Sequence, residues 1–252
     1  MIKGSKNEGP GLIVMAKLPG SGKAKTRLRR VLTRAARRIL QTALVEDALA
    51  KARMVGRTYL AFTPQHLAEE AEAYHGVEVF PQMGDSLGER MANVMEEALG
   101  RGHDQCIVIG TDCPYLTVDD LRAALACLRE TDVCLGPALD GGYYLIGLRR
   151  LHRGIFVDVP WSSQWTLATT LERITALGLR YRLLRSLRDL DTSIDLCALV
   201  RSVMAHGEGG VVSPRVCALL TSWYAEPGSS HRPADVERPM TRAQPGPIME
   251  GG

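Results

Sequence analysis

The chain has 252 residues, of which 45% are hydrophobic and 23% are charged, and these values are typical of a globular protein with enough apolar material for a core. Its net charge of +3 is too small for a protein that coats nucleic acid, although cations concentrate between Lys17 and Arg38. No apolar run is long enough to span a bilayer, and the first residues lack the apolar core of a signal peptide, so we expect a cytoplasmic protein with no membrane partner.

Short apolar runs alternate with helical patterns in the first half of the chain. This alternation is typical of a mostly parallel sheet that is covered by helices on both faces. The predicted strands are 11–16, 57–63, 77–80, 105–110 and 132–138, and the predicted helices are 33–54, 64–74, 86–100 and 118–129.

The rhythm changes after residue 138. We predict a strand at 143–147, a loop through Trp161, a helix at 164–177 and a further strand at 180–184. Thr192 and Asp195 have the spacing of a capping box, which predicts a helix start, and a last helix is predicted at about 213–224. From residue 226 onward the composition is polar and rich in proline, so a disordered tail is expected at 226–252.

The loop after the first predicted strand combines glycines with cations. Gly22 lies among Lys17, Lys23, Lys25 and Arg27, just before a long helical pattern. Backbone N–H groups and cationic side chains that meet at a helix start are a common way to hold a polyphosphate. The sequence therefore predicts nucleotide binding at this loop.

Two other interpretations of the same stretch were weighed. A Walker A motif is excluded, because Gly22-Lys23 is followed by Ala24 and Lys25-Thr26 is preceded by Ala24, so neither register has the required residues. The later arginines, from Arg29 to Arg38, are better explained as a solvated helix face, since charge runs on helices usually face water.

Three aspartates follow predicted strands, where ligands bind in open α/β sheets. Asp112 follows the strand at 105–110, and Asp189 and Asp191 follow the last strand, at positions whose side chains point the same way in extended chain. Three carboxylates without histidine or thiolate suit Mg²⁺ or Mn²⁺. The alternatives are a turn or N-cap role for Asp112 and a helix-dipole role for Asp191.

Cysteine and histidine offer little chemistry. The six cysteines are scattered without a Cys-x-x-Cys, so buried free thiols are expected, and no histidine pair has metal-ligand spacing. The stretch from Asp140 to Tyr143 contains Gly141 and Gly142, which either let another molecule approach the backbone or allow a bend.

Six motifs occur together over about residues 11–200, and in combination they resemble the rSAM/selenodomain-associated transferase 1 family of the GT-A glycosyltransferase and nucleotidyltransferase superfamily. The motifs are Lys25-Thr-Arg-Leu28, Gln82 to Met91, Gly110-Thr-Asp-Cys-Pro114, Gly136 to Tyr144, Pro160-Trp-Ser-Ser163 and Asp189-Leu-Asp191. Departures from the family pattern occur at Lys17, Ser21, Cys113 and Ser163, and the last of these bears on the identity of the acceptor.

The resemblance implies a three-layer α/β/α GT-A domain at 11–225, between an N-terminal extension at 1–10 and the tail. It also implies distant kinship with 2-phospho-L-lactate guanylyltransferase and molybdenum cofactor guanylyltransferase. By this analogy Lys17, Lys25 and Asp112 are catalytic, and Asp112, Asp189 and Asp191 hold the metal. The expected nucleotide-binding residues are Lys17, Gly22, Lys25, Arg27, Gln82, Asp85, Leu87, Gly88 and Arg90. The expected acceptor-binding residues are Asp140, Gly141, Gly142, Tyr143, Trp161, Ser162 and Ser163.

These inferences lead to a metal-dependent nucleotidyltransferase that moves a nucleotidyl group from an NTP to a small phosphorylated, phosphonate or carboxylate acceptor and releases pyrophosphate. One alternative is a glycosyltransferase that uses an NDP-sugar donor. A second is a non-catalytic protein that binds RNA or anions through its basic stretch, which the shortage of aromatic residues disfavours.

Overall fold

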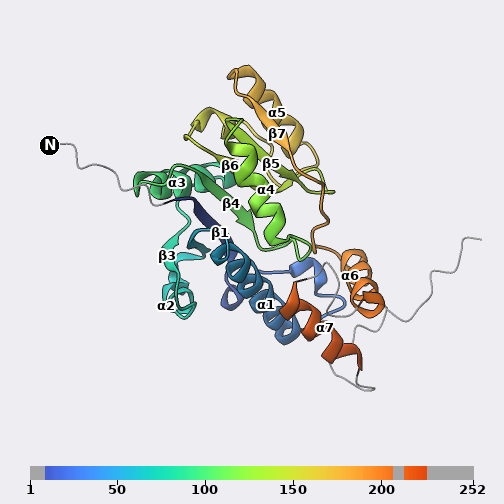
Figure 1. Cartoon of the computed structure of the whole chain (residues 1–252). Coiled ribbons are helices and arrows are strands. Elements are labelled where there is room, and N and C mark those ends of the chain that lie inside the picture. Colours follow the sequence, from blue (N-terminus) through green and yellow to red (C-terminus); the bar gives the residue numbers. More distant parts are fainter. Residues whose placement is uncertain (1–8, 207–212, 226–252) are drawn as a thin grey trace, which may run out of the picture.

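The computed structural model describes residues 9–206 and 213–225, and a seven-stranded sheet lies at its centre (Figure 1). The order of the strands in this sheet is β3-β2-β1-β4-β6-β5-β7. The strands are β1 Gly11–Lys17, β2 Arg57–Thr63, β3 Glu78–Pro81, β4 Cys106–Gly110, β5 Val133–Pro137, β6 Tyr143–Leu148 and β7 Tyr181–Leu183. The helices are α1 Arg34–Arg53, α2 Ala68–Glu72, α3 Leu87–Gly100, α4 Val118–Leu128, α5 Thr166–Ala176, α6 Ser193–His206 and α7 Pro214–Ala225.

The sheet is parallel except at β6. Strands β1 to β4 run the same way, β7 is parallel to β5, and β6 is antiparallel to both β4 and β5. Only residues 138–142 connect β5 to β6. A connection this short joins antiparallel neighbours, because a parallel crossover needs a dozen residues or more. The predicted mostly parallel α/β arrangement is confirmed.

Two apolar layers cover the sheet, and the alternation along β1 shows both. Leu12, Val14 and Ala16 are buried on the face that packs against α1, α2 and α4. Ile13 faces the other side, where α3, α5 and the segment around Ile155 pack. This is the three-layer α/β/α arrangement.

Helices α6 and α7 form a further layer on the outer side of α1 (Figure 1). Leu40 and Leu44 of α1 are buried there in one apolar cluster with Leu199 of α6 and Leu220 of α7. The helix α1 is therefore apolar on two faces, one toward the sheet and one toward the C-terminal helices.

Most predicted elements lie where the sequence pattern placed them. The helix predicted at 64–74 is shorter, because Gln65–Leu67 form a 3₁₀ turn and only Ala68–Glu72 are α-helical. The capping box is present, since Asp195 N donates to Thr192 Oγ1 at 3.3 Å and Thr192 N donates to Asp195 Oδ2 at 2.8 Å.

The remaining expectations for the chain concern its ends, its thiols and membranes. All six cysteines are free, and five of them are buried, as predicted. The predicted disordered tail and most of the predicted N-terminal extension lie outside the described residues. Among the helices of the described segments, none combines the length and apolar character required to cross a membrane.

Candidate functional site

A cavity of about 730 Å³ lies at the edge of the sheet where β1, β2 and β4 have their carboxyl ends. This is where ligands bind in open α/β sheets. Most predicted site residues line it, namely Lys17, Lys25, Arg27, Gln82, Leu87, Arg90, Asp112, Asp140, Gly142, Tyr143, Trp161, Ser162, Ser163, Asp189 and Asp191. Four predicted residues do not line it, and these are Gly22, Asp85, Gly88 and Gly141.

The cationic loop from Leu18 to Leu28 is held in an unusual backbone conformation. It contains two short 3₁₀ turns, Pro19–Ser21 and Thr26–Leu28, and Gly22 between them has a φ of 64°. Lys25 has a φ of 53°, which is uncommon for a residue with a Cβ atom and is often found at functional sites. This conformation directs the Lys25 side chain into the cavity.

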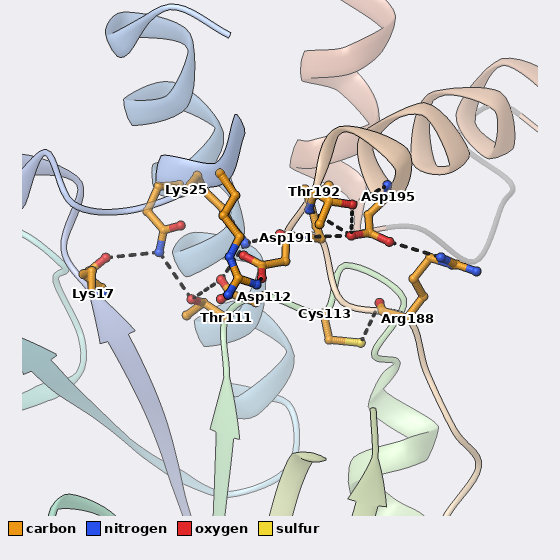
Figure 2. Close-up of polar contacts among 12 residues, drawn as sticks. Lys17, Lys25, Thr111, Asp112, Cys113, Arg188, Asp191, Thr192 and Asp195 are labelled. Atoms are coloured by element: carbon orange, nitrogen blue, oxygen red, sulfur yellow. Dashed lines mark hydrogen bonds and ion pairs between the residues drawn. The ribbon is translucent and has the colours of Figure 1, made fainter. Parts of the chain in front are cut away.

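Lys25 joins the loop to the aspartates (Figure 2). Its side chain is 2% exposed, and its ammonium nitrogen lies 2.7 Å from Asp112 Oδ1. The same nitrogen donates to the main-chain carbonyl of Leu190, which stands between Asp189 and Asp191. Three segments that are distant in sequence therefore meet at one ammonium group.

A second ion pair lies beside the first. Arg27 Nη1 contacts Asp191 Oδ2, and both side chains are partly exposed. The main chain supports the same arrangement, since Leu190 N donates to the carbonyl of Asp112 at 2.7 Å. The backbone of Asp112 thus binds the segment from Asp189 to Asp191, and its side chain binds Lys25.

Asp189 is a half-buried acid of this cluster. Its Oδ1 atom is buried and has no hydrogen-bond partner. Burial, and then the negative charges of Asp140, Asp112 and Asp191, raise the pKa of the Asp189 carboxyl to about 7. A cation at this position would stabilise the ionised carboxylate.

The structure assigns the capping positions of α4 and α6 to residues other than Asp112 and Asp191. The N-cap of α4 is Thr117, whose side chain accepts from Asp120 N, and not Asp112. At the start of α6 the carboxylate that accepts the backbone N–H bonds is that of Asp195, while Asp191 pairs with Arg27. Asp112 and Asp191 are therefore available to the cavity.

No group of three or more histidine, cysteine or acidic side chains within residues 9–206 and 213–225 is arranged as a ready metal site. Two of the three predicted ligands carry cationic partners instead, Lys25 on Asp112 and Arg27 on Asp191. The predicted metal trio therefore meets in space, and its role as a metal site stays a prediction.

Gln41 is a cavity residue that the sequence analysis missed. It lies in the middle of α1 and is 2% exposed. Its Nε2 atom donates to the carbonyl of Lys17 at 3.1 Å and to Thr111 Oγ1 at 3.3 Å. It fixes the ends of β1 and β4 relative to each other. Within a helical pattern it is indistinguishable from an ordinary surface glutamine, so no sequence signal marks it.

The sequence did not predict several other residues that line the cavity. Their only sequence signal is that they lie next to a predicted site residue. Lys23 and Thr26 belong to the cationic loop, and Thr111 precedes Asp112. Thr63 ends β2, at the same sheet edge as Lys17. Residues next to a predicted ligand at the end of a strand are therefore good candidates for lining the cavity.

The segment from Gln82 to Arg90 forms one side of the cavity. Gln82 is buried, and its Nε2 atom donates to the carbonyl of Ala61 at 2.8 Å and of Ala16 at 3.3 Å. Arg90 Nε donates to the carbonyl of Gly84 at 2.9 Å. Asp85 is exposed, and its backbone N–H is held by the Glu89 carboxylate at 2.8 Å.

Gly88 lies behind this side and serves packing. A Cβ atom there would be 2.6 Å from Trp161 Cζ2 and 2.9 Å from the carbonyl of Phe156. The ring of Trp161 lies 6.4 Å from the rings of Tyr143 and Phe156. Gly88 therefore allows α3 to approach the aromatic side chains that line and back the cavity.

The paired glycines after Asp140 make a bend. Gly141 has a φ of 91°, and a Cβ atom at this position would lie 2.2 Å from the carbonyl oxygen of Gln164. The Asp140 carboxylate accepts from Gly142 N at 2.9 Å, which closes the turn. Of the two interpretations given for these glycines, the bend describes Gly141.

The two predicted serines lie at the mouth of the same region. Ser163 Oγ donates to the carbonyl of Pro160 at 2.7 Å and accepts from Trp165 N at 3.2 Å, so it shapes the turn before α5. Ser162 is exposed and has a φ of 62°. Both residues line the cavity, and Ser162 presents its hydroxyl more freely.

Known proteins show similar sequences and a similar fold. A sequence model of the family described as "Uncharacterized protein conserved in bacteria (DUF2064)" matches residues 44–163. A phosphoenolpyruvate guanylyltransferase of Sphaerobacter thermophilus is 33% identical over 117 residues, which are 45% of this chain and 56% of that protein. A protein of the same name from Chloroflexus aggregans is 31% identical over 121 residues, which are 45% of this chain and 59% of that protein.

These matches span a little more than half the length of the curated relatives. A crystal structure from Desulfovibrio desulfuricans G20, assigned as a nucleotide-diphospho-sugar transferase, is matched more fully. It is 29% identical, with a TM-score of 0.76, over 84% of this chain and 97% of that chain. The predicted fold and the predicted resemblance to the GT-A superfamily of nucleotide-dependent transferases are thereby confirmed.

Proposed function

We propose that the protein is a divalent-metal-dependent nucleotidyltransferase that uses an NTP and a small anionic acceptor. The observation that carries the proposal is the meeting of Lys25 with Asp112 and with the backbone between Asp189 and Asp191. Cations for phosphate oxygens and carboxylates for a metal ion face one cavity. The similarity to two proteins named phosphoenolpyruvate guanylyltransferase supports the reaction class.

The donor is proposed to bind with its phosphates on the cationic loop. Lys17, Lys23, Lys25 and Arg27 all line the cavity on this side. On binding, the phosphates would take Lys25 and Arg27 as partners in place of Asp112 and Asp191. The base would lie along the segment from Gln82 to Arg90. By analogy with the named relatives, guanine is the first base to test.

The released carboxylates are proposed to hold the metal. Asp112, Asp189 and Asp191 offer oxygen ligands of the kind that Mg²⁺ and Mn²⁺ prefer. The buried and unpaired Oδ1 atom of Asp189 fits this role, because its charge is otherwise opposed by three neighbouring acids. When bound, the metal ion would offset negative charge on the phosphates during transfer.

The acceptor is proposed to bind beside Asp140, Tyr143, Trp161 and Ser162. Among the described residues, none that lines the cavity is a histidine. An acceptor that attacks through a phosphate, phosphonate or carboxylate oxygen is already ionised near neutral pH, so it needs no general base. A cavity without histidine is therefore compatible with an anionic acceptor.

The chemical step follows from this placement. An acceptor oxygen attacks the α-phosphorus of the donor, the new P–O bond forms, and the bond to the leaving pyrophosphate breaks. No proton has to be moved. Lys25 and Arg27 would stabilise charge on the phosphates, and the cavity walls would hold the nucleophile in line.

A pyrophosphate-release assay tests the proposal. The purified protein is incubated with each NTP in turn, Mg²⁺ and phosphoenolpyruvate, and pyrophosphate is measured through a coupled pyrophosphatase. We expect release with one preferred NTP, dependent on both acceptor and metal, and roughly 10²- to 10³-fold less release from Asp112→Asn. Absence of pyrophosphate with every NTP and a panel of phosphate, phosphonate and carboxylate acceptors would contradict it.

A second candidate is favoured by the structural relative from Desulfovibrio desulfuricans, which is assigned as a nucleotide-diphospho-sugar transferase. The same aspartates and cations would then hold the diphosphate of an NDP-sugar. Release of NDP from NDP-sugars, with no pyrophosphate from any NTP, would identify this activity instead.

A further inference from the structure

A second, smaller cavity lies beside the cationic loop and is lined by cations. Its lining includes Gly20, Gly22 and Ala24 of the loop together with Arg34, Arg37 and Arg38 of α1. Ala24 lines both this cavity and the large one, so the loop separates the two. Neither the proposed donor site nor the proposed acceptor site uses these three arginines.

The three guanidinium groups have no carboxylate partner within residues 9–206 and 213–225. The ion pairs found there involve other arginines and lysines. Arg37 Nε is buried and has no hydrogen-bond partner, while Arg37 Nη1 donates to the carbonyl of Ala24 at 3.4 Å. Three arginines line one small cavity, and in the described part of the chain none of them has a carboxylate in direct contact to offset its charge. An anion bound there would offset this charge.

The carboxylate of Glu70 is held beside this cavity, at Gly20. It accepts a hydrogen bond from Gly20 N at 2.9 Å and does not line the small cavity. The lining is thus positive, with main chain of the loop on its other side. Glycine is favoured at position 22, because its φ is 64°, and a Cβ atom there would lie 3.2 Å from Arg34 Nη2.

The size of the cavity limits what can enter. Its volume is about 40 Å³. One water position needs roughly 10–15 Å³ of such volume, so the cavity holds a group about as large as three waters. A single phosphoryl group fits this size, whereas a nucleoside does not.

We propose that Arg34, Arg37 and Arg38 form a second anion site that binds one phosphoryl group, on the side of the cationic loop opposite to the large cavity. Guanidinium groups match phosphate oxygens through paired N–H donors, which favours phosphate over chloride. The phosphoryl group has two sources, free phosphate or pyrophosphate from solution and the terminal phosphate of a bound nucleotide. An anion here would hold the segment that carries Lys23 and Lys25 against α1.

Titration calorimetry with inorganic phosphate tests the site on the full chain without nucleotide. The test variant is the double substitution R34Q/R38Q, and the matched control is R29Q/R30Q, which removes the same charge from exposed arginines outside the cavity. We expect R34Q/R38Q to bind phosphate at least roughly tenfold more weakly, since hydrogen bonds to charged groups are lost, and R29Q/R30Q to bind as the wild type does.

A further pair of measurements separates the sources and the sites. Lys25→Gln disables the proposed donor site and should keep phosphate binding, so failure of the proposed function would leave this result unchanged. If instead only the nucleotide's terminal phosphate uses the arginines, R34Q/R38Q weakens NTP binding and not phosphate binding, which overturns a site for free phosphate.

An equal loss of phosphate binding in R29Q/R30Q would show a non-specific charge effect and overturn the proposal. Should R34Q/R38Q not fold, Arg38→Gln alone, at an exposed position, is compared with Arg30→Gln.

Discussion

The large cavity has an ionic wall and an aromatic wall. In the ionic wall, Lys25 contacts Asp112 and Arg27 contacts Asp191. In the aromatic wall, Trp161 packs near Tyr143 and against Gly88. Under the proposed function, the contacts of the ionic wall are exchanged for phosphate oxygens and a metal ion. Those of the aromatic wall depend on close packing and change only if the backbone shifts. Substitutions in the ionic wall should therefore alter activity as well as stability, and those in the aromatic wall should alter mainly stability.

The largest effect is expected at Asp112. Asp112→Asn removes a proposed metal ligand and keeps the side-chain volume, so we expect kcat/KM to fall by roughly 10²- to 10³-fold. Steady-state kinetics measures this effect, with Asp191→Asn as a second variant and thermal unfolding as the check on folding. Full activity of both variants with Mg²⁺ would remove the metal assignment.

Asp189 should make stability depend on pH. The pKa of its carboxyl is raised in the folded state to about 7 from 3.8. Between about pH 4 and pH 7 the folded state therefore keeps a proton that the unfolded state has lost. Stability should therefore fall as pH rises from about 4 to 7 and stay low above, by on the order of 2–4 kcal/mol. Urea unfolding in the presence of a chelator measures it.

The matched variants for that experiment are Asp189→Asn and Asp85→Asn, the second at an exposed position outside the cavity. Asp189→Asn should remove this pH dependence and exceed the wild type in stability at pH 8. An Asp189→Asn protein that loses stability with pH just as the wild type does would show that Asp189 ionises normally.

The two ion pairs of the ionic wall should contribute differently to the free energy of unfolding of the protein. The Lys25 side chain is 2% exposed, and removing its ammonium leaves the Leu190 carbonyl without that donor, so Lys25→Gln should cost about 1–3 kcal/mol. The Arg27 side chain is 67% exposed, so Arg27→Gln should cost less than about 1 kcal/mol. Denaturant unfolding of the two variants side by side measures the difference, and equal costs would refute it.

In the aromatic wall we expect a loss of stability and no change in the ionic contacts. Gly88→Ala places a methyl group against Trp161 and should destabilise the protein by about 1–2 kcal/mol. The control is Gly100→Ala in the same helix, where a Cβ atom meets nothing within 4 Å and alanine should be neutral or stabilising. Thermal unfolding compares them, and a Gly88→Ala protein as stable as Gly100→Ala would refute the packing role.

The sequence predicted the strand ends well and the contacts between them poorly. Asp112 and Lys17 follow apolar runs directly, so the sheet topology alone carries them to the same edge. Gln41 was missed because its neighbours along α1 give no sign that it faces β1 and β4. Gly88 and Asp85 were predicted to bind nucleotide because they belong to a motif, whereas the structure places one against Trp161 and the other at the surface.

The order of the last strands also required the structure. The short link between β5 and β6 indicates an antiparallel pair, but the insertion of β6 between β4 and β5 depends on contacts over long sequence distance. The pairing of Arg27 with Asp191 is of the same kind, since 164 positions separate the two residues.

The most direct test of the central claim is the binding of an NTP in the presence and absence of Mg²⁺, measured by titration calorimetry on the wild type, Asp112→Asn and Lys25→Gln. We predict a single site whose affinity falls at least roughly tenfold without Mg²⁺ and in either variant. An NTP affinity that is unchanged by chelation and by both substitutions would show that the loop and the aspartates do not share one metal–nucleotide complex.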